Sequence, residues 1–273
     1  MKQRYFRTHT KFGVELPKTV ERALEIDKET GTTFWADAIA KEMKTVFVAF
    51  EILPEDKLAP PGHKLIKCHM IFDLKSDGSM ARKARLVAGG HMTGEPESMT
   101  YASVVSRESV RLALMLAALN GLEVLQADVE GAYLNAKSTE KLYTRCGPEF
   151  GELCGHCLII FKALYGLRSS GQRWHERFAD CLRNEGFEPC KADPDVWMRP
   201  AVRTDKSEYY EYVLLYVDDC LVLSEKAEDI IRKEIGKYFE LKEESIGPPD
   251  IYLGGKLRRV VLENCSKAWA FGL

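Results

Sequence analysis

The chain is organised around Tyr216-Val217-Asp218-Asp219, in which two adjacent acids are enclosed by apolar runs at 212–215 and 220–223. Each run has the length and composition of a β-strand. Adjacent carboxylates resist burial unless a partner or a cation compensates their charge. The stretch therefore predicts either an acidic tip on a surface hairpin or a site for a divalent metal, since Mg²⁺ prefers hard oxygen ligands. Asp-Asp lacks the glycine or asparagine that two-residue turns prefer, but the residues alone leave both interpretations open.

The composition is that of an ordinary globular protein, with 45% hydrophobic and 29% charged residues among 273. Lys and Arg number 39 against 41 Asp and Glu, so the net charge of -2 does not by itself indicate a nucleic-acid partner. The longest apolar run, 112–119, is too short to cross a membrane, and no signal peptide is recognisable. We therefore expect an intracellular protein that is not secreted and has no membrane partner.

The eight cysteines are scattered along the chain and are interpreted as free thiols. Cys154-Gly155-His156-Cys157 has the Cys-x-x-Cys spacing of zinc ligands, but no second ligand pair follows at zinc-finger spacing. We do not expect zinc here.

Hydrophobic periodicity predicts a mixed chain of helices and tight hairpins. Helices are expected near 20–30, 35–43 (capped by Thr32 and Thr33), 106–120, 170–186 and 227–239. Hairpins are expected at 63–88, 209–223 and 251–261, and single strands at 123–128, 142–145 and 157–161. Because the two kinds of element alternate irregularly, the pattern favours an α+β fold over a doubly wound parallel sheet.

A basic segment lies within the first hairpin. Between positions 64 and 85 there are six basic residues and two acidic ones, although the chain is slightly acidic overall. They are Lys64, Lys67, Lys75, Arg82, Lys83 and Arg85. Such a segment is either a solvated strand face or a flap whose charged donors grip phosphates.

Four sequence blocks, taken in order, resemble the reverse transcriptases of copia-type LTR retrotransposons. They are KARLVA (83–88), QADVEGAYLN (126–135), LYGL (164–167) and YVDD (216–219). A lone Tyr-x-Asp-Asp is a weak signal, whereas four blocks in the right order and context are a strong one. The resemblance extends over roughly 35–261 and marks the chain as a piece of a retrotransposon Pol polyprotein.

The resemblance implies a right-hand polymerase with fingers and palm, in which an antiparallel palm sheet packs on helices, and the activity of an RNA-directed DNA polymerase. It further implies that Asp128 meets Asp218 and Asp219 in space as the catalytic and metal-binding residues. In that family these acids hold two Mg²⁺ ions, for which Mn²⁺ can substitute. Two such ions activate the primer 3′-hydroxyl and stabilise the pyrophosphate leaving group. Asp128 and Asp218 would be the principal ligands and Asp219 a supporting carboxylate.

The nucleotide-binding residues also follow from the resemblance. Lys83 and Arg85 would hold the incoming triphosphate, near the amides of Gly131 and Ala132. Tyr133 would lie under the sugar, although an arbitrary tyrosine at a strand end is more often a core residue. Tyr165 and Gly166 would pack beside the nucleotide and template.

The expected partners are an RNA or DNA template-primer, deoxynucleoside triphosphates and, in a full-length element, the RNase H and integrase domains of Pol. We expect a helical leader at 1–42, fingers and palm at 43–262, and the truncated start of a following region at 263–273. The compartment would be the cytoplasm, in a virus-like particle, or the nucleus.

Because the chain stops at Leu273 without recognisable RNase H, integrase or protease motifs, the alternative is an inactive nucleic-acid-binding remnant. A different palm-like nucleotidyltransferase is a further alternative.

Overall fold

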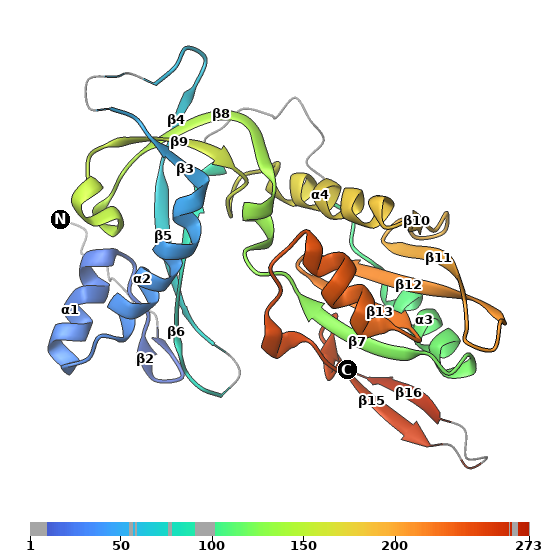
Figure 1. Cartoon of the computed structure of the whole chain (residues 1–273). Helices are drawn as coiled ribbons and strands as arrows, with labels where there is room; N and C mark the ends of the chain where they lie inside the picture. The colour runs from blue at the N-terminus through green and yellow to red at the C-terminus, as the bar shows by residue number, and fades with distance from the viewer. Residues whose placement is uncertain are drawn as a thin grey trace. The chain divides into compact units, whose positions relative to one another are not determined.

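The computed structural model describes residues 10–272 except 55–56, 58, 76–77, 91–101, 262 and 264–266. The chain divides into two compact units (Figure 1). The first unit consists of residues 1–100 and 133–173, and the second of 101–132 and 174–273. Each unit has its own hydrophobic core. The mixture of helix and antiparallel sheet in both units confirms the α+β class, while the boundaries expected at 42 and 262 stay predictions.

Two helices open the first unit after a short hairpin of β1 (Thr10–Lys11) and β2 (Val14–Glu15). Helix α1 (Val20–Thr30) ends at Gly31, whose left-handed conformation closes it. Helix α2 (Phe34–Val46) follows. Thr33 is its N-cap residue, as predicted, but the side chain of Thr33 makes no capping bond. Instead the buried carboxylate of Asp27 accepts the N–H groups of Trp35 and Ala36 at 3.0 and 2.9 Å, which ties the two helices together.

Two sheets complete the first unit. The first has the order β3-β9-β8-β4 and contains one parallel pair, β4 with β8. Its strands are β3 (Phe50–Ile52), β4 (Lys64–Ile66), β8 (Lys137–Arg145) and β9 (Cys157–Lys162). The second sheet is the expected hairpin, β5 (Cys68–Leu74) with β6 (Arg82–Ala88); part of its predicted turn lies outside the described residues. Short 3-10 helices occur at Phe47–Ala49 and Pro148–Leu153.

The second unit is built on a five-stranded antiparallel sheet with the order β10-β11-β12-β13-β7. The strands are β7 (Glu123–Asp128), β10 (Glu188–Pro189), β11 (Val196–Val202), β12 (Glu208–Tyr216) and β13 (Asp219–Ser224). Strands β12 and β13 are the apolar runs on either side of the acidic pair. Side chains of a strand alternate between the two faces of its sheet, and both faces of β13 are buried. The sheet therefore needs a covering layer on each side.

Helix α3 (Arg107–Leu119) covers one face, where Val110 and Leu114 join a core with Leu221 and Leu223. A smaller sheet contributes to the same core. Its strands are β14 (Ile251–Tyr252), β15 (Gly255–Val261) and β16 (Lys267–Gly272). The hydroxyl of Tyr252 donates to the carbonyl of Leu214 at 3.1 Å and so joins the two sheets.

The opposite face is covered by α4 (Ser170–Asn184) and by a helical segment at 227–237 (Figure 1). That segment comprises α5 (Ala227–Asp229), a π-helical turn (Ile230–Glu234) and a 3-10 turn (Ile235–Lys237). The rings of Trp174 and Phe178 on α4 pack against Phe239 just beyond it, with centroids 5.0 and 5.3 Å away. The sequence predicts inward positions at Ala227, Ile230, Ile231, Ile235, Tyr238 and Phe239. All are buried except Tyr238, which is partly exposed. Within the part of the chain that the structure describes, no helix is long and apolar enough to cross a membrane.

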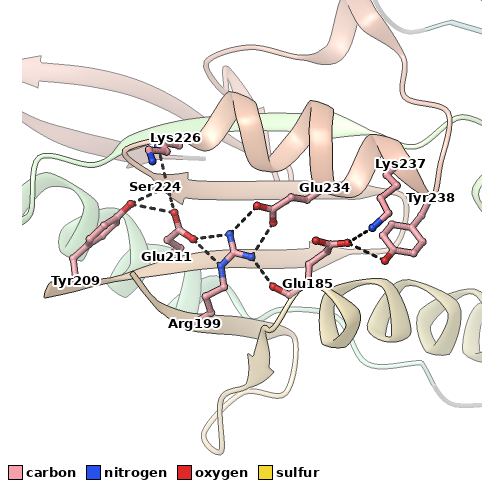
Figure 2. A network of polar contacts seen from close by, with 9 residues as sticks. All are labelled: Glu185, Arg199, Tyr209, Glu211, Ser224, Lys226, Glu234, Lys237 and Tyr238. Atoms are coloured by element: carbon pink, nitrogen blue, oxygen red, sulfur yellow. Dashed lines mark hydrogen bonds and ion pairs between the residues drawn. The ribbon is translucent and has the colours of Figure 1, made fainter. Parts of the chain in front are cut away.

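A partly buried network of ion pairs and hydrogen bonds joins this face of the sheet to the helical segment (Figure 2). The guanidinium of Arg199 lies between Glu211, 2.7 Å away, and Glu234, 2.9 Å away. Burial alone would lower the pKa of Arg199, but the two carboxylates raise it. Glu211 is almost completely buried and also accepts hydrogen bonds from Ser224 and Tyr209. Its charge is therefore compensated on all sides, as a buried carboxylate requires.

Replacing Arg199 with Met should lower the free energy of unfolding by about 3 kcal/mol, because it leaves a buried carboxylate without its cation. Urea unfolding followed by tryptophan fluorescence measures the loss. As a control, Arg183→Met breaks an exposed pair with Asp180 and should cost about 0.5 kcal/mol or less. Adding Glu211→Gln to Arg199→Met should restore part of the stability. If the double variant is the less stable of the two, the uncompensated charge is not the cause.

Candidate active site

The two residues at the tip of the acidic hairpin are Val217 and Asp218, and not Asp218 and Asp219. Tyr216 pairs with Asp219, so Asp219 is already the first residue of β13. Val217 has a φ of 55°, a left-handed conformation that costs energy for a β-branched residue. Two hydrogen bonds hold this strained turn. Trp174 Nε1 donates to the carbonyl of Val217 at 2.6 Å, and the N–H of Val129 donates to the carbonyl of Asp218 at 3.0 Å.

Strand order brings the third acid to the hairpin. Strand β7 pairs with β13 in a register that places Asp128 directly opposite Asp219. Directly opposed residues of an antiparallel pair have Cβ atoms about 4.5–5.5 Å apart, and like charges at such positions repel. The expectation that Asp128 lies beside the Asp218-Asp219 hairpin thus has a direct structural basis. Both opposed acids are half-buried, which makes the repulsion more costly than on an open surface.

The electrostatics of the three acids reflect this crowding. Burial, together with the charges of Asp218 and Asp128, raises the pKa of Asp219 to about 6, although Lys242 lowers it. Burial also raises the pKa of Asp128, as do the charges of Asp218 and Glu244, and Lys242 again opposes the shift. The carboxylates therefore form a region of excess negative charge with one nearby ammonium group.

That ammonium group is a residue that the sequence pattern did not reveal. Lys242 Nζ donates to Asp128 Oδ1 at 2.6 Å. The lysine follows the helical segment and precedes a 3-10 turn (Glu243–Ser245) that lies beside the end of β7. No local periodicity predicts this contact, because the two residues are 114 positions apart.

The donor chemistry of the site fits a divalent cation, because carboxylate oxygens are the ligands that Mg²⁺ prefers. The arrangement fits less well. Among the described residues, no group of three or more Asp, Glu, His or Cys side chains is arranged to hold a metal ion. One candidate ligand, Asp128, is instead occupied by Lys242. Binding of an ion would therefore require this pair to open or shift.

The first unit brings together most of the residues expected to bind the nucleotide. Lys83 and Arg85 lie on β6. The guanidinium of Arg85 lies 4.7 Å from the ring centroid of Tyr165, and the ring of Tyr133 lies 4.7 Å from the same ring. We call these three side chains the Arg-Tyr-Tyr stack. Gly131 and Ala132, the other two expected residues, precede Tyr133 in the chain and belong to the second unit.

Gly166 is required by close backbone packing. The N–H of Ala88 donates to the carbonyl of Tyr165 at 2.7 Å, which brings β6 against the Leu164–Leu167 block. A Cβ added to Gly166 would lie 2.1 Å from the carbonyl oxygen of Ala88, and the φ of Gly166 is 91°. Only glycine fits this position.

A second residue without an assigned role, Glu42, supports the strand that carries the basic pair. It lies on α2, and its Oε1 accepts the N–H of Leu86 at 2.9 Å. Burial raises the pKa of Glu42, whereas Arg85 and Lys83 lower it through their positive charges. Glu42 recurs with Trp35, Ala38, Ile39 and Met43 at helical spacing in the sequence. An acid within such an apolar pattern needs a partner, and this was the available signal.

A comparison with known protein families identifies the family of the chain. The family model described as "Reverse transcriptase (RNA-dependent DNA polymerase)" matches residues 57–261. This is well over half of the sequence, so the chain belongs to the reverse transcriptase family. The resemblance carried by the four sequence blocks is thereby confirmed.

The curated relatives are Pol polyproteins of retrotransposons. The chain is 32% identical over 211 residues to the retrovirus-related Pol polyprotein from transposon TNT 1-94 of Nicotiana tabacum, a match that covers 73% of this chain and 15% of the relative. It is 28% identical over 216 residues to that from transposon RE1 of Arabidopsis thaliana, covering 76% and 14%. It is 29% identical over 192 residues to the transposon Ty1-DR5 Gag-Pol polyprotein of Saccharomyces cerevisiae, covering 68% and 10%. The chain therefore spans about a seventh or less of these relatives.

Asp219→Asn should stabilise the metal-free chain at pH 8 but not at pH 4. Folding raises the pKa of Asp219 from 3.8 to about 6. As the pH rises between these two values, the unfolded chain loses the proton of Asp219 more readily than the folded chain does, so the stability of the wild type falls. Asparagine removes this loss of stability. Differential scanning calorimetry with a chelator should show a melting temperature about 2–4 °C above wild type at pH 8. An equal difference at pH 4 would contradict the electrostatic explanation.

Proposed function

We propose that the chain is the RNA-directed DNA polymerase domain of a copia-type retrotransposon Pol polyprotein, with the first unit as fingers and the second as palm. The observation that carries the proposal is the register of β7 and β13, which sets Asp128 opposite Asp219, with Asp218 in the adjoining turn. A five-stranded antiparallel sheet with helices on both faces supports the palm assignment.

The three acids would form the catalytic centre. Asp128 and Asp218 would be the principal metal ligands and Asp219 a supporting one. When bound, two Mg²⁺ ions, or Mn²⁺ in their place, activate the primer 3′-hydroxyl and stabilise the leaving pyrophosphate. The contribution of the chain itself is to hold the carboxylates on adjacent strands and to fix the turn that carries Asp218 through Trp174 and Val129.

The basic residues of β6 would bind the incoming triphosphate. Arg85 and Lys83 provide charge-assisted donors for phosphate oxygens. The stacking of Arg85 on Tyr165 limits the conformations of its long side chain, so less entropy is lost when the phosphate binds. The amides of Gly131 and Ala132 would approach the same phosphates, and Tyr165 with Gly166 would pack beside the nucleotide and template.

Tyr133 would lie under the sugar and exclude ribonucleotides. Its ring is held against Tyr165 in the Arg-Tyr-Tyr stack, which supports a rigid steric block rather than a mobile side chain. A built-in clash of this kind discriminates against the wrong substrate without any bond to the right one.

The partners would be a template-primer of RNA or DNA and deoxynucleoside triphosphates. In the full-length element, RNase H and integrase domains would accompany this domain, and the compartment would be a cytoplasmic virus-like particle or the nucleus. A remnant that binds nucleic acid without turnover is the second candidate. The observation that favours it is the occupation of Asp128 by Lys242.

Asp218→Asn should abolish primer extension on poly(rA)·oligo(dT) with Mg²⁺ and with Mn²⁺. A loss of at least about 10²-fold is expected, because a group that stabilises developing charge is removed. As a matched control, Asp180→Asn changes an exposed acid of α4 that pairs with Arg183 and should keep full activity. Circular dichroism confirms that both variants fold.

Two results would speak against the proposal. If wild type extends no primer with either metal but retains the template-primer in filter binding, the remnant is the better description. If Asp218→Asn extends as well as wild type, this carboxylate is not catalytic.

Tyr133→Val should admit ribonucleotides while largely sparing deoxynucleotide incorporation, and Tyr133→Phe should change little, because the ring provides the block. The ratio of GTP to dGTP incorporation on poly(rC)·oligo(dG) measures the effect. We expect that ratio to rise about 10²-fold in the valine variant, in line with removal of a steric clash of a few kcal/mol. An unchanged ratio would return Tyr133 to the role of a core aromatic.

A further inference from the structure

The segment that carries Lys242 is fixed at one end to the residues just after β7 and at the other end to β7 itself. On one side of the lysine, Val129 forms a bridge with Leu241, and the N–H of Glu130 donates to the carbonyl of Glu240 at 2.9 Å. On the other side, Gln126 and Gly247 exchange hydrogen bonds of 2.8 and 3.2 Å. The segment 240–247 therefore runs along the free edge of β7, past the residue that ends the strand.

Asp128 itself is bound by this segment through three groups. The N–H of Lys242 donates to the carbonyl of Asp128 at 3.0 Å, and Ser245 Oγ accepts the N–H of Asp128 at 2.9 Å. Lys242 Nζ then completes the contact on the carboxylate. Because the backbones of the two residues are bonded to each other, the ammonium group cannot diffuse far from the carboxylate.

Glu243, the acidic residue next to Lys242, does not pair with this lysine. Glu243 pairs with Arg232 at 2.7 Å, so the charge next to Lys242 in the sequence is compensated separately. Asp128 and Lys242 are both partly exposed, at 23% and 37% of their side-chain surface, so water and ions can reach the pair.

We propose that Lys242 is an internal counter-ion which holds Asp128 in the metal-free chain and competes with a divalent cation for that carboxylate. Lys242 thereby sets the affinity of the acidic site for its metal, and it acts as a positioning residue through Asp128. This inference rests on the proposed function, because it takes Asp128, Asp218 and Asp219 as the cation site.

The competition between Lys242 and a metal ion is electrostatic. A unit positive charge within hydrogen-bond distance of a ligand oxygen repels an incoming divalent ion and must be displaced by it. Without the lysine, the crowded carboxylates have only a cation from solution to relieve their repulsion. A purely structural lysine would have the opposite effect, because its loss would loosen the site and weaken metal binding.

The test is a titration of Mn²⁺ into the full chain without nucleic acid, in which free Mn²⁺ is followed by electron paramagnetic resonance. Lys242→Met should lower the dissociation constant about tenfold, as expected for removal of one nearby charge. Lys242→Arg keeps the charge and should stay within about twofold of wild type. Lys237→Met removes another lysine of a lysine–carboxylate pair, the one with Glu185, and should change nothing.

Two further measurements secure the interpretation. Asp219→Asn should weaken Mn²⁺ binding in both the wild-type and the Lys242→Met backgrounds, which locates the ion at the acids. Thermal melts in a chelator should show Lys242→Met below wild type, with Mn²⁺ raising its melting temperature more than that of wild type. If the methionine variant does not fold, Lys242→Gln replaces it.

The outcomes separate this inference from the proposed function. If wild type binds Mn²⁺ in an Asp219-dependent way and Lys242→Met binds it equally or less tightly, the competition is refuted and the metal site stands. If neither protein binds Mn²⁺ in that way, the metal site is refuted and the competition with it.

Discussion

The constraint on which the second unit depends is the pairing of β7 with β13, which sets half-buried carboxylates opposite each other. Like charges at such positions repel, and burial strengthens the repulsion. The neighbouring structure compensates for it. Lys242 lies on Asp128, and Trp174 and Val129 hold a turn whose valine has an unfavourable conformation. Strain and uncompensated charge at one place are features of functional sites rather than of a structural core.

The same sheet carries a second charged cluster, around Arg199, in which the charges are better balanced than at the acidic hairpin. Around Arg199, two carboxylates share one guanidinium, and Glu211 also accepts hydrogen bonds from Ser224 and Tyr209, so much of the charge is balanced internally. At the acidic hairpin, several carboxylates share one ammonium group that is partly exposed. The first cluster needs nothing further and joins sheet to helix. The second has an excess of negative charge that a cation from solution can balance.

The first unit supports its basic strand in a different way. The backbone of β6 is held by Glu42, which accepts the N–H of Leu86, and by the loop containing Gly166, where the carbonyl of Tyr165 accepts the N–H of Ala88. Arg85 then stacks on Tyr165, which also contacts Tyr133. Residues from three sequence blocks thus form one surface, because a glycine permits two backbones to approach within hydrogen-bond distance. The arrangement restricts side chains that would otherwise sample many rotamers, as a binding surface requires.

The sequence by itself determined the α+β class, the acidic hairpin between two apolar strands, the amphipathic segment 227–239 and, through four ordered blocks, the family. These are local properties, expressed in periodicity and composition over a few residues. Only the tertiary structure decided that Asp128 lies opposite Asp219, that the turn is formed by Val217 and Asp218, and that Lys242 and Glu42 are the partners of the two sites. Packing of a helix and of a loop segment against the strands brings together residues more than 40 or 100 positions apart, and no local pattern encodes which distant charge will meet another.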